Sequence, residues 1–277
     1  MLNAHDYAFL ADFLRRRSGL SINSEKAYLI ESRLKPIALR SGFKTATDLV
    51  RRLRAGDETL ARTVIEAMTT NETSFFRDKL PFDQFRDVML PALMRAREND
   101  SQLRIWCCAA SSGQEPYSIA MIVEGAAQLA GWSIDIVASD INVEMVERAR
   151  EGLYNQFEVL RGLPIQMLGR HFHNEGGEWR VSSAIRRRVQ FEVFNLLDSF
   201  EPLGQFDVIF CRNVLMYFDP PLKHDILGRL ADALAPDGYL VLGSAETVLG
   251  SGKGVEPLVN ARGIYVKSSA QSRAMMG

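Results

Sequence analysis

Apolar residues in the first 70 positions recur at the spacing of one helix face. The first stripe is made of Tyr7, Phe9, Leu10, Phe13 and Leu14. Gly19 follows it, and glycine just beyond a periodic stretch is typical of a helix end. Three further helices are expected over residues 24–39, 45–56 and 59–68. Ser24 would cap the first of these three and Pro36 would kink it. No strand pattern occurs here, so residues 1–70 are predicted to form a small all-helical domain.

The pattern changes near residue 103, where short apolar runs rich in β-branched and aromatic residues alternate with helical stretches. The runs predict strands over residues 103–108, 134–139, 189–194, 206–211, 239–243 and 263–266. Helices are expected between them over residues 116–129, 142–151 and 220–235. Nearly continuous apolar strands that alternate with helices are typical of a parallel sheet covered on both faces. Residues 71–267 are therefore predicted to form an α/β domain with a Rossmann-like sheet.

Residues 155–188 interrupt this alternation. Gly176 and Gly177 stand between two short apolar runs, a pattern typical of an antiparallel hairpin. We therefore predict an antiparallel β-subdomain inserted between two strands of the sheet. Residues 268–277 are small and polar, and we expect this tail to be disordered.

Composition limits the class of protein. The chain has 277 residues, of which 47% are apolar and 24% charged, which fits about two globular domains and excludes disorder for most of the chain. The net charge of −1 argues against a nucleic-acid binder, which usually carries a basic excess. No apolar run reaches the ~20 residues of a membrane helix, and the first residues lack the pattern of a signal peptide. We therefore expect a cytoplasmic protein that does not insert into membranes.

Cysteine and histidine do not indicate a metal site. Cys107, Cys108 and Cys211 are too few and too poorly spaced for a disulfide framework or a zinc site. His171 and His173 would share one face of a strand in the β-subdomain, but no further ligand candidates surround them. We expect surface histidines and no bound metal.

The loop after the first predicted strand indicates a ligand. Residues 109–118 read AASSGQEPYS, with Gly113 as the only glycine and no lysine after it, so NAD and ATP are disfavoured. Asp140 ends the second strand, where a carboxylate can accept hydrogen bonds from both hydroxyls of a ribose. A ribose without a phosphate site favours S-adenosylmethionine, and Glu115 would add negative charge near its sulfonium. The alternative is that Asp140 only caps the following helix.

Three longer segments stand out in the chain. They read TTNETSFFRD at residues 69–78, RIW and then GQEPYSIAM between residues 104 and 121, and DVIFCRNVLMYFD at residues 207–219. Together they resemble the CheR family, the chemotaxis receptor methyltransferases. The resemblance covers the chain from near its N-terminus to about residue 250, in the same order and at comparable spacing. It includes the helical domain and the inserted hairpin.

The resemblance implies transfer of a methyl group from S-adenosylmethionine to glutamate side chains of methyl-accepting chemotaxis receptors, which leaves S-adenosylhomocysteine. By motif position, the implied cofactor-binding residues are Asn71, Thr73, Arg77, Glu115, Asp140, Asn195, Leu196, Arg212 and Asn213. It also implies that Arg77 and Tyr217 line the reaction centre. Without the resemblance, Tyr217 would be interpreted as a core aromatic at a strand end, and Arg77 as a solvated residue at a helix start.

One position departs from the family's Gly-Cys-Ser-Thr-Gly-Glu-Glu loop, which reads AASSGQE here. Ala109 stands in the first glycine place, and alanine does not readily adopt a positive φ. We therefore expect the loop geometry to differ from the family's, without a loss of activity.

Two other functions stay open at this stage. One is a cofactor-binding signalling module without activity. The other is a protein N-methyltransferase, suggested by the Asp-Pro-Pro-Leu run at residues 219–222. Such enzymes carry an aromatic residue where Leu222 stands, so we interpret the run as a helix start with proline in its first turn.

Charge is distributed unevenly along the chain. Residues 1–56 carry 11 Lys or Arg against 5 Asp or Glu, so the near-neutral total hides a basic N-terminal region. A solvated helix face is the simplest explanation. Because receptor methylation helices are acidic, we instead expect this domain to dock them, with the hairpin as a second contact. The protein is expected to be a monomer.

Overall fold

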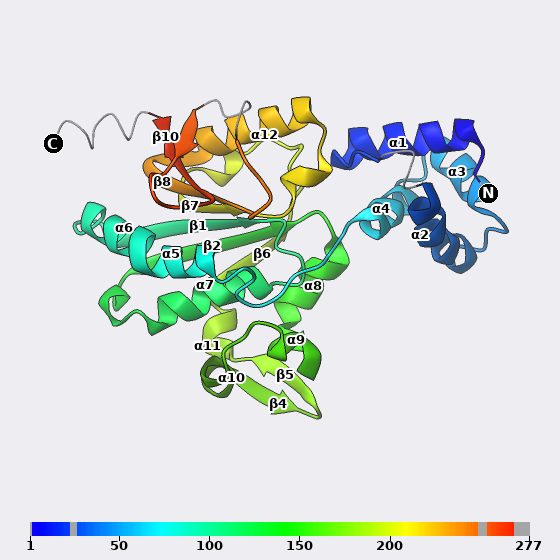
Figure 1. The fold of residues 1–277 in the computed structure, drawn as a ribbon. Helices are drawn as coiled ribbons and strands as arrows, with labels where there is room; N and C mark the ends of the chain where they lie inside the picture. Colours follow the sequence, from blue (N-terminus) through cyan, green and yellow to red (C-terminus); the bar gives the residue numbers. More distant parts are fainter. Residues whose placement is uncertain (1, 23–26, 249–253, 269–277) are drawn as a thin grey trace.

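The computed structural model of the protein describes residues 2–22, 27–248 and 254–268 (Figure 1). Within them the chain forms a helical N-terminal domain, a sheet domain and a small β-subdomain. The cap expected at Ser24 and the expected tail beyond residue 268 lie outside the described residues. In the described part of the chain, no helix is both long and apolar enough to cross a membrane.

The N-terminal domain, on the right of Figure 1, is all-helical, as predicted. Its helices are α1 (Ala4–Ser18), α2 (Ala27–Arg40), α3 (Ala46–Arg54) and α4 (Glu58–Met68). Gly19 ends α1 in the left-handed conformation at φ 75°, and a capping box between Thr45 and Asp48 begins α3. Fully buried Leu14 and Val64 lie at the centre of this domain's own core.

Seven strands of the described residues form one sheet in the order β6-β2-β1-β7-β8-β10-β9. They are β1 (Gln102–Cys108), β2 (Ser133–Asp140), β6 (Val189–Val193), β7 (Phe206–Cys211), β8 (Leu234–Leu242), β9 (Val255–Pro257) and β10 (Ile264–Lys267). The strands from β6 to β8 in this order run parallel, as predicted. The prediction is wrong for β10, which is antiparallel to both β8 and β9, because periodicity does not report strand direction. The sequence pattern also misses β9, which has one buried residue.

Helices cover both faces of the sheet. They are α5 (Leu80–Gln84), the π-helical turn η2 (Phe85–Met89), α6 (Leu90–Ala96), α7 (Gln114–Gly125), α8 (Val143–Glu151) and α12 (Pro220–Ala233), with 3₁₀ turns η3 (Ala127–Leu129), η4 (Glu201–Leu203) and η5 (Leu215–Tyr217). Predictions for α7, α8 and α12 are confirmed, and α12 begins at Pro220 behind its cap Asp219. The stretch from α5 to α6 was not predicted, because Pro81, Pro91 and the π turn disrupt the helical period.

Side chains of β1 point alternately into two cores, one on each face of the sheet. Ile105 and Cys107 belong to the core that includes residues of α5, η2 and α7. Trp106 and Cys108 belong to the core that includes residues of α12. Burial on both faces explains why the strands are apolar along their whole length.

The β-subdomain lies at the bottom of Figure 1 and contains the predicted hairpin. Its elements are β3 (Leu153–Tyr154), α9 (Gln156–Leu160), α10 (Ile165–His171), β4 (Phe172–Glu175), β5 (Glu178–Val181) and α11 (Ser183–Arg186). Gly176 and Gly177 connect β4 to β5 with φ angles of 64° and 98°, as a tight hairpin turn requires. The placement of His171 was wrong, because it ends α10 and is buried, whereas His173 is exposed on β4.

Candidate active site

A pocket opens at the carboxyl ends of β1, β2 and β7. The strand order reverses at β1, and such a switch point is where open α/β sheets bind ligands. All ten residues that the sequence analysis assigns to the site line this pocket: Asn71, Thr73, Arg77, Glu115, Asp140, Asn195, Leu196, Arg212, Asn213 and Tyr217. The structure thus brings them together, while their contacts with a ligand stay a prediction.

The loop after β1 has a positive φ at two residues other than glycine, 53° at Ala109 and 51° at Ser111. The expectation that alanine would avoid this conformation is therefore wrong. The left-handed conformation costs an L-residue about 1–2 kcal/mol, and neighbouring hydrogen bonds offset this cost. The Ala110 N–H donates to the Ser139 carbonyl oxygen at 2.9 Å, and the Ser111 N–H donates to a carboxylate oxygen of Asp140 at 2.8 Å.

Gly113 leads from this loop into α7 at φ 93°. A Cβ at this position would lie 2.9 Å from the Cβ of Ala149 in α8. Both the positive φ and the close approach of α8 therefore require glycine. The Tyr154 hydroxyl donates to the Ser112 carbonyl oxygen at 2.6 Å, so strand β3 of the β-subdomain also contacts this loop.

Asp140 places a buried carboxylate at the end of β2. Its Oδ2 accepts the Ser111 N–H and its Oδ1 accepts the Asn142 N–H at 2.9 Å. Burial raises the pKa of Asp140 above its ordinary value, and these backbone donors oppose the rise. Asn142, not Asp140, caps α8, because its side chain accepts the Met145 N–H. Each carboxylate oxygen of Asp140 keeps a second lone pair for a ligand.

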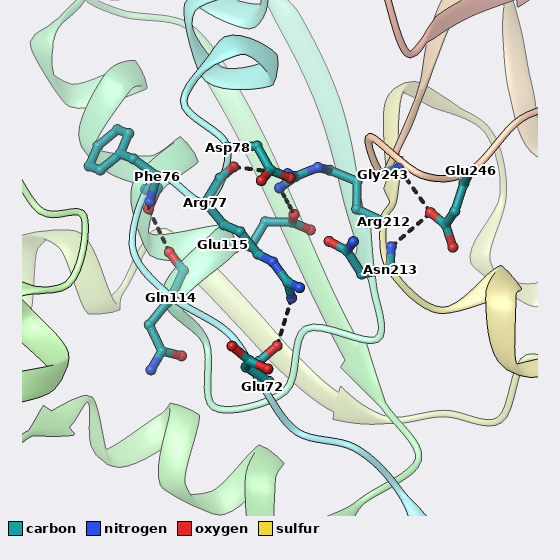
Figure 2. A network of polar contacts seen from close by, with 11 residues as sticks. Glu72, Phe76, Arg77, Asp78, Gln114, Glu115, Arg212, Asn213, Gly243 and Glu246 are labelled. Atoms are coloured by element: carbon teal, nitrogen blue, oxygen red, sulfur yellow. Dashed lines mark hydrogen bonds and ion pairs between the residues drawn. The ribbon is translucent and has the colours of Figure 1, made fainter.

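Arg212, which lines the pocket, joins two acidic residues, Glu115 and Asp78 (Figure 2). Its side chain is 1% exposed. Its Nη1 donates to Glu115 at 2.7 Å, and its Nη2 donates at 2.8 Å both to Asp78 and to the Arg77 carbonyl oxygen. Burial raises the pKa of Glu115, and the Arg212 guanidinium opposes this rise. The network ties the end of β7 to the start of α7 and to the segment that carries Arg77.

Arg77 lies in an irregular turn that the sequence pattern does not reveal. Phe76, Asp78 and Lys79 have positive φ angles of 49°, 66° and 48°. The Phe76 N–H donates to the Ser118 hydroxyl at 3.0 Å, and Arg77 donates from Nη1 to the Glu72 carbonyl oxygen at 2.7 Å. These bonds and the Arg212 network hold a conformation that L-residues rarely adopt.

Tyr217 belongs to η5, six residues beyond the end of β7, and is half-buried. It is therefore not the core aromatic at a strand end that the alternative interpretation expected. Its carbonyl oxygen accepts the Ser21 N–H at 2.8 Å, and Asn195 donates from Nδ2 to the Arg17 carbonyl oxygen at 2.8 Å. The N-terminal domain thus contacts two of the segments that form the pocket.

Sequence reasoning missed several lining residues: Ser18, Leu20, Thr69, Thr70, Glu72, Ala109, Ala110, Ser111, Ile141, Phe194, Val214 and Phe218. Six of them directly adjoin a predicted residue, and Thr69, Ala109, Ala110 and Ser111 lie in segments that the sequence already marked, so position along the chain was a usable signal. Ser18 and Leu20 had no such signal, because their contribution depends on how the N-terminal domain packs. Among the described residues, no cluster of three or more His, Cys, Asp or Glu could hold a metal ion.

Two family models match the chain. The all-alpha domain of CheR methyltransferases matches residues 5–69, and the S-adenosylmethionine (SAM) binding domain of CheR methyltransferases matches residues 71–263. SAM is therefore the cofactor. A solved structure of PKMT2 from Rickettsia typhi in complex with AdoHcy is 14% identical, with a TM-score of 0.37, over 62% of this chain and 26% of that chain. That likeness is too slight to bear on function.

Curated relatives match over most of their length. The chain is 42% identical over 249 residues to chemotaxis protein methyltransferase 1 of Pseudomonas aeruginosa, with 88% of this chain and 90% of that protein covered. It is 41% identical over 252 residues to chemotaxis protein methyltransferase Cher2 of Pseudomonas putida, with 88% and 91% covered. These relatives and the two family models show that the chain belongs to the CheR methyltransferase family.

Proposed function

We propose that the enzyme methylates glutamate side chains of chemotaxis receptors. The observation that supports an anionic acceptor is that Arg77 and Tyr217 line one pocket. A guanidinium and a phenol hydroxyl both donate hydrogen bonds that suit a carboxylate. A glutamate side chain has an ordinary pKa of about 4.3 and is therefore ionised at neutral pH. It can attack a methyl group without a general base.

The residues around the pocket fit SAM. Asp140 has a lone pair on each oxygen for the two hydroxyls of a ribose. The buried Nε of Arg212 has no hydrogen-bond partner within the described residues, so it is a donor that a bound ligand can satisfy. Further lining residues that would hold the cofactor are Asn71, Thr73, Glu115, Asn195, Leu196 and Asn213. When bound, SAM supplies an electrophilic methyl group on a sulfonium.

In this reaction the protein would orient the reacting groups and exclude water from them. Arg77 is fixed by its bond to Glu72 and would orient the attacking carboxylate. Tyr217 would either donate a hydrogen bond to that carboxylate or pack against the methyl group. Leu20 and Phe218 line the same pocket and would exclude water from the charged groups. In-line placement of oxygen and carbon then lowers the barrier.

A labelled methyl group on SAM is expected to appear on glutamates of the cytoplasmic part of a chemoreceptor. Mild alkali should release the label as methanol, because esters hydrolyse and N-methyl groups do not. A receptor whose methylated glutamates are changed to alanine is the control and should take no label. Alkali-stable label would contradict the proposal in favour of an N-methyltransferase. An unlabelled receptor, with a protein that still binds S-adenosylhomocysteine, would favour an inactive module.

Only some of the basic residues of the N-terminal region are available for the receptor docking that we propose. Six of the basic residues before position 57 are in ion pairs, namely Arg15, Arg16, Arg17, Arg51, Arg52 and Arg54. Arg33 donates to the carbonyl oxygens of Met68 and Thr69, and Lys26 lies outside the described residues. Within the described ranges, the exposed residues Lys35, Arg40 and Lys44 form no direct ion pair, and the charge of Lys44 acts at longer range on Asp48. We call these three residues the basic ridge.

Neutralising the basic ridge is expected to weaken receptor methylation mainly at low salt. In the variant with Lys35, Arg40 and Lys44 changed to glutamine, kcat/KM for the receptor should fall about tenfold at low ionic strength, because charge complementarity raises the association rate. The difference from the unchanged protein should shrink at ~0.3 M salt, where screening is strong. The measurement is initial methylation rate against receptor concentration at several salt concentrations.

The matched control for this variant removes three exposed charges from the sheet domain, by glutamine substitutions at Arg86, Arg95 and Arg262. Arg86 lies on η2, Arg95 on α6 and Arg262 just before β10, and their loss should change kcat/KM less than threefold. Equal losses in both variants would show that net charge alone matters. A kcat/KM of the unchanged protein that is flat with salt would also refute docking through the basic ridge.

A further inference from the structure

Glu246 is a buried carboxylate that the sequence analysis does not connect with the site. It follows β8 and is 6% exposed. Its Oε2 accepts the N–H of Asn213 at 2.8 Å and the N–H of Gly243 at 2.9 Å, and its Oε1 accepts the N–H of Met216 at 3.3 Å. Among the described residues it forms no ion pair. Within the described part of the chain, its carboxylate oxygens accept hydrogen bonds from these three backbone N–H groups.

Two of these donors belong to the turn that presents pocket residues. Asn213 begins the turn in the left-handed conformation, at φ 59°, and lines the pocket. Met216 directly precedes Tyr217, which lines the same pocket. One carboxylate thus binds the turn at its first residue and again beside Tyr217, as Figure 2 shows for the Asn213 end. A turn fixed at both ends has few ways to move its side chains.

Gly243 shows how closely these groups are packed. A Cβ at this position would lie 2.8 Å from Oε2 of Glu246 and 2.9 Å from Nδ2 of Asn213. The φ of Gly243 is not in the left-handed region, so close approach, not backbone conformation, requires glycine here. Any larger residue would push the carboxylate away from the turn.

We propose that Glu246 is a positioning residue for methyl transfer, which fixes the turn over residues 213–217 and so places Tyr217 at the reaction centre. Glu246 is not among the described residues that line the pocket, so it acts through the turn. This inference rests on the role that the proposed function gives to Tyr217. The three donors explain why a carboxylate is used. Its two oxygens can accept all three N–H groups, whereas an amide would turn its own NH₂ group toward one of them.

The test is methyl transfer to the receptor by the Glu246→Gln variant. The expected result is a fall in kcat of at least tenfold at a temperature where the variant is folded, with a smaller change in the Kd of S-adenosylhomocysteine. The matched control is Asp207→Asn, which changes a buried carboxylate at the amino end of β7 that accepts the Arg104 N–H at 2.8 Å. The control should lose thermal stability and keep its kcat. A fall of less than threefold in Glu246→Gln, or an equal fall in the control, would overturn the proposal.

A double-variant cycle separates positioning from a structural role. Tyr217→Ala alone should lower kcat, and adding Glu246→Gln should lower it no further, because both changes remove the same contribution. Additive losses would overturn the proposal.

If Glu246→Gln does not fold, Gly243→Ala disturbs the same contact and is judged by the same limits. If Tyr217→Ala keeps full kcat, the role of Tyr217 in the proposed function fails. If Tyr217→Ala lowers kcat while Glu246→Gln and Gly243→Ala leave kcat unchanged, only the positioning role of Glu246 fails.

Discussion

Replacing Asp140 by alanine is expected to weaken the binding of S-adenosylhomocysteine at least 100-fold, as measured by calorimetric titration. The carboxylate lies at the end of β2 in the pocket. One of its oxygens accepts a hydrogen bond from the backbone N–H of Ser111 and the other from that of Asn142. A hydrogen bond to a charged group is worth about 1.5–3 kcal/mol, so the loss of two ribose contacts corresponds to a factor of about 100 or more.

The pH dependence of binding provides a second signature of Asp140. Burial raises its pKa, so the carboxylate takes up a proton at a higher pH than an ordinary aspartate. Affinity should therefore fall as the pH is lowered toward that raised pKa, and this fall should be much smaller in Asp140→Ala. The control is Asp135→Asn, on the same strand but paired with Arg104 near its opposite end. Unchanged affinity in Asp140→Ala, or an equal loss in the control, would refute the assignment.

Replacing Arg212 by methionine is expected to destabilise the protein and abolish methyl transfer. The side chain is 1% exposed and pairs with Glu115 and Asp78. Removing one partner from a buried ion pair costs about 3–5 kcal/mol. For a chain of this size we expect the melting temperature to fall by roughly 10 °C. Scanning calorimetry and the labelled transfer assay measure the two effects.

The penalty should arise mainly at Glu115, because the Asp78 side chain is 38% exposed and can be hydrated, whereas that of Glu115 is 11% exposed. Adding Glu115→Gln to Arg212→Met should therefore restore part of the lost stability without restoring activity. Arg16→Met is the control, because Arg16 pairs with Asp12 where both side chains are more than half exposed, and such pairs contribute less than about 1 kcal/mol. If Arg212→Met is no less stable than this control, the ion-pair network does not hold the pocket as described.

Continuous apolar strands made the sheet predictable from the sequence. β7 matches its predicted range at both ends, because every residue from Phe206 to Cys211 is buried. The helical segment around η2 was not predictable from periodicity. Its two prolines and its π turn shift the apolar positions away from the spacing of a regular helix.

That the candidate residues share one pocket was predictable from the long motifs at Arg77, Glu115 and Arg212, and from the strand end at Asp140. The conformation at Ala109 was not, because local preference argues against a positive φ there and hydrogen bonds from neighbouring segments override it. Glu246 was also out of reach of sequence reasoning, since its partners are backbone groups of a different loop. A side chain that works through backbone contacts leaves no residue pattern to recognise.

The contact between the N-terminal domain and the turn at Tyr217 matters for the design of chimaeric enzymes. Besides the bond from Ser21 to Tyr217, Leu20 pairs with Phe218 as an isolated bridge, and Arg15 pairs with Asp219. A Cβ at Gly19 would lie 2.7 Å from the Leu222 side chain. A helical domain taken from a relative would therefore bring its own version of this contact into the pocket. A chimaera should therefore take the helical domain and the turn at residues 213–222 from the same relative.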